Sequence, residues 1–200
     1  MRDTACQTLL LYNDTPVQKI ITETSEKVGV QLWIKREDLN HPYVSGNKWW
    51  KLKYNIAEAV SQGYSRILTF GGAYSNHIYA VAAAAKEVGL QSIGIIRGEE
   101  ILPLNSTLQF AREQGMQLYY ISREQYRHKN DPEFLKTLPL QLGSYWLIPE
   151  GGTNNLAVKG VAEFAKTLVL HHADYLCVPV GTGGTMAGLI EGLEDRVKLI

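Results

Sequence analysis

Lys48 is the residue whose position points most directly to chemistry. It lies in the stretch VSGNKWWKL, residues 44–52, just past a small-residue turn and at the start of a predicted helix that Ser45 or Asn47 would cap. Lys51 follows one turn later on the same face. The partial positive charge of a helix N-terminus disfavours an ammonium and favours a neutral, nucleophilic amine. The alternative is an ordinary solvated lysine that begins an amphipathic helix.

A second polar stretch, GGAYSNH at residues 71–77, joins a predicted strand to a predicted helix. In parallel α/β folds, ligands bind at the carboxyl ends of strands, and adjacent glycines permit their close approach. Ser75 offers a hydroxyl, Asn76 an amide and His77 an imidazole that titrates near neutrality. These groups are predicted to bind a substrate carboxylate beside a helix N-terminus. The alternative is that Ser75 only caps the helix and that His77 is a partly exposed first-turn residue.

A third stretch, GTGGTMAG at residues 181–188, also leads from a strand into a helix. Its exposed N–H groups, its hydroxyls and the helix dipole favour a phosphate group. The predicted cradle consists of Gly181, Thr182, Gly183, Gly184 and Thr185. Met186 stands where the dinucleotide-binding pattern needs glycine, and the P-loop lysine is absent, so another phosphate ester is expected. A purely structural glycine turn is the alternative.

A nucleophilic lysine, a carboxylate-binding loop and a phosphate cradle together indicate pyridoxal phosphate. Lys48 would form the Schiff base with its aldehyde, and the loop of residues 181–185 would hold its phosphate. Ser75 and Asn76 would bind the substrate carboxylate, and the cofactor would supply the carbanion chemistry.

The elements that position these stretches alternate along the chain. Strands are expected at 32–38, 66–70, 91–96, 117–121, 145–149, 175–180 and 197–200, and helices at 47–62, 75–88, 105–114, 131–137, 154–170 and 185–192. Short apolar strands that alternate with helices predict an α/β fold with mainly parallel sheets covered by helices. The chain ends inside an apparent strand, so a C-terminal portion present in longer relatives is expected to be missing.

The composition narrows the class of protein. The 200 residues are 45% apolar and 20% charged with a net charge of zero, so no nucleic-acid or anionic-membrane partner is expected. Cys6 and Cys177 are far apart and form no metal-binding spacing. They are interpreted as reduced thiols of a cytoplasmic protein, and no metal site is expected.

The motifs resemble a known signature. Ser45–Lys48, Ser75–His77 and Gly181–Thr185 are similar to those of the fold-type II pyridoxal-phosphate enzymes, the tryptophan synthase β-subunit superfamily. The branch that they most resemble contains 1-aminocyclopropane-1-carboxylate deaminase and D-cysteine desulfhydrase. The segments Lys35–Leu39 and Pro149–Gly152 fit the same branch.

The resemblance implies a role for each candidate residue. Lys48 would carry the cofactor and move the substrate proton, Lys51 would lie near the phosphate, and Asn76 would hydrogen-bond the ring hydroxyl. Ser75 would contact the substrate and is a candidate catalytic residue. His77 would also contact the substrate; it matches the desulfhydrases, since the deaminases usually have glutamine at this position.

The resemblance also implies an architecture. Two three-layer αβα domains are expected, with the cofactor between them, and the chain is expected to form a homodimer. Residues 1–50 and 155–200 would form the larger domain, and residues 51–154 the smaller, inserted one. The family tyrosine near the substrate and the group facing the pyridine nitrogen would lie in the missing portion. Trp49–Trp50 and Ile78–Tyr79 depart from the family pattern.

The expected activity is that of a pyridoxal-phosphate-dependent lyase or deaminase acting on a small amino acid. The desulfhydrase reaction converts D-cysteine to pyruvate, ammonia and hydrogen sulfide. The alternatives are the 1-aminocyclopropane-1-carboxylate deaminase reaction, which is a hydrolase activity, and a truncated cofactor-binding protein with little or no turnover. A non-catalytic α/β module that binds another phosphate ligand is a further alternative.

Overall fold

The computed structural model describes residues 10–170 and 173–200, apart from the side chain of Pro139. Cys6 lies outside the described residues, whereas Cys177 is a free, exposed thiol. No helix in the described ranges is long and apolar enough to cross a membrane. The strands are β1 (Val17–Ile20), β2 (Leu32–Lys35), β3 (Arg66–Gly72), β4 (Gln91–Arg97), β5 (Gln117–Ile121), β6 (Trp146–Ile148), β7 (Tyr175–Leu176) and β8 (Lys198–Leu199). The α-helices are α1 (Glu23–Lys27), α2 (Asn47–Ser61), α3 (Asn76–Glu87), α4 (Ser106–Glu113), α5 (Arg123–Arg127), α6 (Pro132–Leu142), α7 (Asn155–Thr167) and α8 (Gly184–Leu193), and the 3-10 turns are η1 (Glu37–Leu39) and η2 (Glu150–Gly152).

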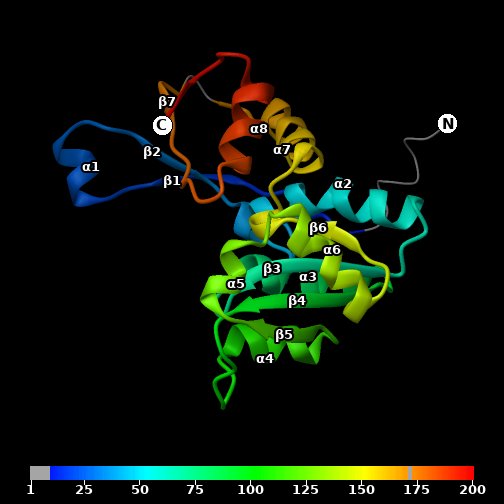
Figure 1. Ribbon diagram of the computed structural model, residues 1–200. Coiled ribbons are helices and arrows are strands. Elements are labelled where there is room, and N and C mark those ends of the chain that lie inside the picture. The colour runs from blue at the N-terminus through cyan, green and yellow to red at the C-terminus, as the bar shows by residue number, and fades with distance from the viewer. Residues whose placement is uncertain (1–9, 171–172) are drawn as a thin grey trace.

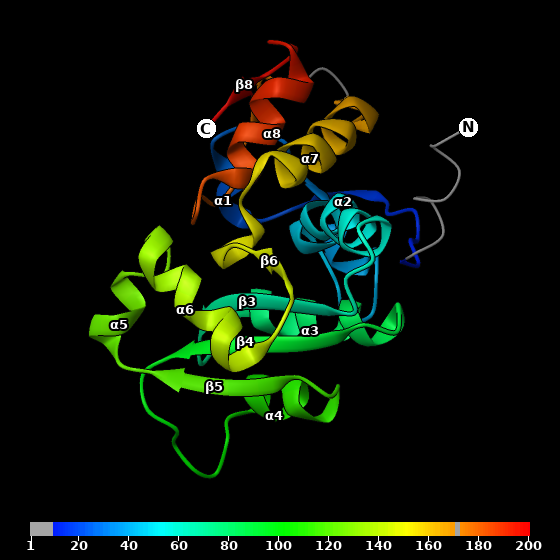
Figure 2. The ribbon, with the colours of Figure 1, turned by 45° about the vertical axis from the view of Figure 1, so that its right-hand side comes forward.

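A four-stranded parallel sheet forms the centre of the fold, in the order β5-β4-β3-β6. Helices α3 and α4 cover one face and α5 and α6 the other (Figures 1 and 2). In both views, α7 and α8 lie together beyond the β6 edge. Buried on both faces, β3 and β4 are almost continuously apolar, as parallel strands require.

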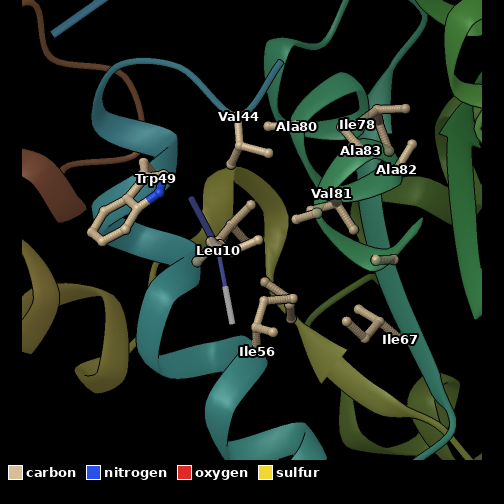
Figure 3. Close-up of a cluster of buried hydrophobic side chains, with 14 of the residues drawn as sticks. Leu10, Val44, Trp49, Ile56, Ile67, Ile78, Ala80, Val81, Ala82 and Ala83 are labelled. Carbon is tan, nitrogen blue, oxygen red and sulfur yellow. The ribbon is translucent and has the colours of Figure 1, made fainter. Parts of the chain in front are cut away.

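Alternate residues of β3 serve two different cores. Ile67 packs in the larger apolar cluster with α2 and α3, whereas Leu68 and Phe70 pack with α5 and α6. Figure 3 shows Ile67 in this cluster together with Ile78 of α3 and Ile56 of α2. Each fully buried side chain of this size contributes about 1.5–3 kcal/mol of burial free energy. The alanines of α3 are small, so α2 can approach α3 closely.

Glycines bring α7 and α8 into close contact. A Cβ atom added at Gly188 of α8 would lie 2.5 Å from Cβ of Val161 and 2.8 Å from the carbonyl oxygen of Val158, both in α7. Gly192, one turn later, would place a Cβ 2.3 Å from the carbonyl oxygen of Ala162. The close packing of α8 against α7 therefore depends on a face of α8 that carries no side chains. This packing fixes the position of the start of α8.

The structure confirms the parallel α/β pattern and corrects several boundaries. β1, α1 and α5 were not predicted. The strand expected at 32–38 ends at Lys35, because η1 follows it. The strand expected at 175–180 pairs with β8 only over Tyr175–Leu176. The helix expected at 131–137 continues to Leu142. Gly46, at φ 67°, is the N-cap residue of α2, so neither Ser45 nor Asn47 caps it.

The structure does not show the second three-layer αβα unit that was expected among the described residues. Among the described residues, one sheet has four strands, and the other two sheets are the β1–β2 hairpin and the short β7–β8 pair. Helices α7 and α8 pack together, but the β7–β8 pair beside them has only two residues in each strand. The division into residues 1–50 with 155–200 and residues 51–154 stays a prediction.

Gly188→Ala tests the contact between α7 and α8. We expect the free energy of unfolding to fall by about 1–3 kcal/mol, because the added methyl meets backbone and branched side-chain atoms that must shift. Urea unfolding followed by circular dichroism measures the change. Glu191→Ala, on the exposed face of the same helix, is the matched control and should change stability by no more than about 0.5 kcal/mol. Equal stability of the two variants would contradict the proposed packing.

Candidate functional site

One cleft of about 390 Å³ gathers the three polar stretches. It lies between the start of α2, the loop before α3, the η2 turn and the loop before α8. The predicted residues that line it are Lys48, Lys51, Ser75, Asn76, His77, Gly181, Thr182, Gly183 and Thr185. Gly184 lies directly beside it, since a Cβ atom there would be 3.0 Å from Nζ of Lys51. Every residue singled out from the sequence is therefore brought to one place.

The glycine loop presents unpaired backbone at the start of α8. Gly183 takes a left-handed conformation, φ 82°, and no side chain caps the helix. The first N–H groups of α8 are therefore available to an anion. The hydroxyl of Thr185 accepts a hydrogen bond of 2.8 Å from Nδ2 of Asn47, which ties this loop to the stretch that carries Lys48.

Lys51 is a buried cation held by hydroxyl groups. Its side chain is 2% exposed, and Nζ donates to Oγ1 of Thr153 at 3.0 Å and to Oγ1 of Thr182 at 3.4 Å. Burial, followed by the charge of Lys48, lowers the pKa of Lys51 to about 8. Within the described residues, neither lysine forms an ion pair with a carboxylate. A phosphate group fits this site, since it would supply the missing negative charge.

Lys48 is half-buried at the first turn of α2, unlike an ordinary surface lysine. Its Nζ donates to Oδ1 of Asn47 at 3.0 Å. Burial lowers the pKa of Lys48, so the neutral amine is easier to form than in water. An amine in this state is a nucleophile for an aldehyde.

Ser75 caps α3 and lines the cleft at the same time. Its Oγ accepts hydrogen bonds from the N–H groups of His77 at 3.2 Å and Ile78 at 3.3 Å. Gly71 is required beneath it, because an added Cβ would lie 2.4 Å from Cγ1 of Ile78. Asn76 is exposed in the cleft. The capping alternative and the ligand-binding interpretation of Ser75 are therefore compatible.

The environment of His77 differs from the expectation. The residue is 3% exposed, and Nε2 lies 2.9 Å from Oγ1 of Thr69. Because that hydroxyl donates to the carbonyl oxygen of Ile148 at 2.7 Å, it accepts a hydrogen bond from the Nε2–H group of His77. Burial, with the charges of Lys48 and then Lys51, lowers the pKa of His77 to about 3. His77 is therefore neutral throughout the physiological range rather than titrating near neutrality, and it is not a partly exposed residue.

Several residues of the site were not singled out from the sequence, among them Thr153 and Glu150. Thr153 contacts Lys51, and Glu150 lines the cleft. Glu150 accepts a hydrogen bond of 2.9 Å from the hydroxyl of Tyr126 and forms an ion pair of 3.4 Å with Lys129. The signal that could have found both is their position just after β6, at the carboxyl edge of the sheet. No group of three or more histidine, cysteine, aspartate or glutamate residues in the described ranges could hold a metal ion.

Comparisons with known proteins identify the family of this chain and several relatives. The family description "Pyridoxal-phosphate dependent enzyme" matches residues 8–200. A putative 1-aminocyclopropane-1-carboxylate deaminase of Thermotoga maritima is 36% identical over 192 residues, which cover 92% of this chain and 61% of that protein. A mitochondrial bifunctional D-cysteine desulfhydrase/1-aminocyclopropane-1-carboxylate deaminase of Arabidopsis thaliana is 34% identical over 82% of this chain and 45% of its own length. The chain belongs to the 1-aminocyclopropane-1-carboxylate deaminase/D-cysteine desulfhydrase family of pyridoxal-phosphate dependent enzymes.

A solved structure supports the fold of this family member. The crystal structure of a homologue of 1-aminocyclopropane-1-carboxylate deaminase superposes with a TM-score of 0.77 at 27% identity. The match covers 94% of this chain and 59% of that one. The architecture is thus that of a fold-type II pyridoxal-phosphate enzyme. The chain spans less than two thirds of the length of these relatives.

Lys51→Met tests whether the buried ammonium of Lys51 lowers the free energy of unfolding. We expect the variant to be more stable than wild type at pH 7 by about 1–3 kcal/mol, because a buried ammonium with a lowered pKa opposes folding. The pKa of Lys51 is about 8 in the folded protein and near its ordinary value of 10.5 after unfolding. Between these values the unfolded chain binds more protons, so wild-type stability rises with pH and the difference shrinks.

Urea unfolding at pH 7 and pH 10 measures both effects. Lys166→Met, at an exposed position of α7, is the control and should show no such dependence on pH. A destabilising effect of Lys51→Met at pH 7 would contradict the assignment of Lys51 as an uncompensated buried cation.

Proposed function

We propose that the chain binds pyridoxal phosphate in this cleft and acts on a small amino acid as a lyase or deaminase. The observation that carries the proposal is the pair of amines, Lys48 and Lys51, that face a hydroxyl- and glycine-rich helix start with no carboxylate partner. One amine suits an aldehyde and the other suits a phosphate. The family membership supports the same cofactor.

Different residues of the cleft would bind the aldehyde and the phosphate of the cofactor. Lys48 Nζ would bond to the cofactor aldehyde and would move a proton at the Cα atom of the amino acid. Lys51, the hydroxyls of Thr182 and Thr185 and the free N–H groups of α8 would hold the phosphate. When bound, the cofactor supplies an electron-withdrawing ring that stabilises negative charge at Cα.

The loop before α3 would orient the substrate. Ser75 Oγ and the side-chain amide of Asn76 line the cleft and are donors for a carboxylate or a ring hydroxyl. The neutral imidazole of His77 would support this loop from the core side through its contact with Thr69. Glu150 gives the cleft one carboxylate whose charge is partly balanced by Lys129.

The substrate that we propose first is D-cysteine, with pyruvate, ammonia and hydrogen sulfide as products. The histidine at position 77 supports it, since the resemblance assigns histidine here to the desulfhydrases. The second candidate is 1-aminocyclopropane-1-carboxylate, supported by the similarity to the putative deaminase of Thermotoga maritima. A third candidate is cofactor binding with little turnover, because the chain spans only 61% of that relative.

The remaining parts of the proposal concern organisation. We infer that residues 51–154 form a smaller domain inserted into a larger one made of residues 1–50 and 155–200. A cytoplasmic location and a homodimer are part of the same proposal. Light scattering of the purified chain measures the oligomeric state, and a monomeric mass would contradict the proposed homodimer.

Reduction with borohydride tests the covalent role of Lys48. After incubation with pyridoxal phosphate, we expect the pyridoxyl group on the peptide that contains Lys48, located by mass spectrometry. In Lys48→Ala this labelling should be lost, while Lys166→Ala should be labelled like wild type. Persistent labelling of Lys51 alone would move the covalent role to that residue. Binding of phosphate esters without any labelling would favour a non-catalytic phosphate-binding module.

Two product assays separate the candidate substrates. We expect pyruvate and sulfide from D-cysteine in excess of 2-oxobutanoate from 1-aminocyclopropane-1-carboxylate, with both products abolished in Lys48→Ala. The reverse ratio would assign the deaminase reaction. Cofactor labelling with neither product would leave the chain as a cofactor-binding protein with little turnover.

A further inference from the structure

The hydroxyl of Thr153 lies at the centre of the amine and hydroxyl groups at one end of the cleft. Oγ1 of Thr153 is 3.0 Å from Nζ of Lys51 and 2.5 Å from Oγ1 of Thr182. The hydroxyl has no part in capping the helix that follows, because Asn154 Oδ1 accepts from the N–H of Ala157 at 2.9 Å. Its two polar neighbours, Lys51 and Thr182, are both predicted phosphate ligands.

Lys51 donates to both threonine hydroxyls, and the two hydroxyls are hydrogen-bonded to each other. An ammonium group donates hydrogen bonds and cannot accept one, so the hydroxyl of Thr153 accepts a hydrogen bond from Lys51. The two hydroxyls share a further hydrogen bond of 2.5 Å, in which either oxygen can be the donor. The hydroxyl of Thr182, a residue that lines the cleft, also accepts a hydrogen bond of 3.4 Å from Lys51, so both hydroxyls are held against the ammonium. Two of the three Lys51 donors are engaged, and one remains.

Two glycines leave the space that the hydroxyls of Thr153 and Thr182 occupy. A Cβ atom at Gly184 would lie 2.8 Å from Oγ1 of Thr153, and one at Gly151 would lie 2.7 Å from Oγ1 of Thr182. Only glycine at these two positions leaves room for the chain Lys51–Thr153–Thr182. The three members come from α2, from the connection between η2 and α7, and from the connection between β7 and α8.

The charges around Lys51 explain why hydroxyls hold it. Lys48 on α2 is a second cation, His77 on α3 is neutral, and Glu150 on η2 is engaged by Tyr126 and Lys129. A carboxylate at position 153 would neutralise Lys51, whereas a hydroxyl positions the ammonium and leaves its charge for an anionic ligand.

We propose that Thr153 is a positioning residue of the phosphate site, which fixes the Lys51 ammonium and, through a hydrogen bond, the Thr182 hydroxyl. This inference rests on the proposed function, because the phosphate concerned is that of the cofactor. It adds a residue whose contact with the ligand is indirect, through Lys51 and Thr182.

The test compares Thr153→Val, which removes only the hydroxyl, with Thr153→Ser, which keeps it. Dissociation constants are measured for pyridoxal phosphate and, separately, for inorganic phosphate. We expect Thr153→Val to weaken both by about tenfold or more, and Thr153→Ser to stay within about threefold of wild type. Thr167→Val, at an exposed hydroxyl that bonds only the carbonyl oxygen of Phe164, is the control and should bind like wild type.

A ligand-free measurement separates positioning from general damage to the fold. The Lys51 amine is titrated by NMR in protein labelled at lysine Cε, with its signal assigned by its loss in Lys51→Met. Loss of an acceptor destabilises the ammonium, so we expect a lower pKa of Lys51 in Thr153→Val and a wild-type pKa in Thr153→Ser. Unchanged affinities and an unchanged pKa in Thr153→Val would overturn the inference, as would a failure of Thr153→Ser to restore them.

The outcomes also separate this inference from the proposed function. If inorganic phosphate binding depends on the Thr153 hydroxyl but pyridoxal phosphate is not bound, the positioning role stands and the cofactor assignment fails. If pyridoxal phosphate binds equally well to wild type and Thr153→Val, the cofactor assignment stands and the positioning role fails. If wild type binds neither ligand, both are overturned.

Discussion

The burial of one ammonium group, that of Lys51, constrains the arrangement around the cleft. The free energy of taking this charge out of water is offset only in part by two hydroxyl acceptors, so its pKa falls to about 8. The acceptors come from segments that follow Lys51 by 102 and 131 residues in the chain. Their approach depends on the glycines at positions 151 and 184 and on the close contact of α7 with α8. Because this buried ammonium lacks a carboxylate partner, the cleft is complementary to the negative charge of a phosphate group.

The central strand supports the other half of the cleft. Thr69 is a polar residue in the middle of a buried strand, and its hydroxyl is satisfied by the carbonyl oxygen of Ile148 and by His77. These two bonds join β3, β6 and the first turn of α3 beneath Ser75 and Asn76. Leu68 and Phe70 point to the opposite face and pack against α5 and α6, and Tyr126 of α5 also donates a hydrogen bond to Glu150 of the cleft. The strand thus separates a face devoted to packing from a face that positions polar groups.

Much of the fold followed from local patterns. The strands β3, β4, β5 and β6 and the helices α3 and α4 are apolar runs and amphipathic segments bounded by glycines, so local sequence predicts them well. β7 could not be predicted at its true length, because a strand is as long as its pairing, and its partner β8 pairs over two residues. β1 and α1 were missed because polar and apolar residues mix there, and the hairpin forms through pairing with β2. The buried environment of His77 was also missed, since burial is a property of the surroundings and not of the residue.

The sequence by itself determined which chemical groups are available and that each stands where a strand gives way to a helix. Residue types and short-range order carry that information: Lys48 after a small turn, Ser75 at a helix start, and glycines and threonines at 181–185. Only the tertiary structure decided that these groups share one cleft, that Thr153 joins Lys51 to Thr182, and that His77 stays neutral. The physical reason is that distances across the fold, desolvation and the direction of hydrogen bonds depend on how distant segments pack, which no local pattern of residues encodes.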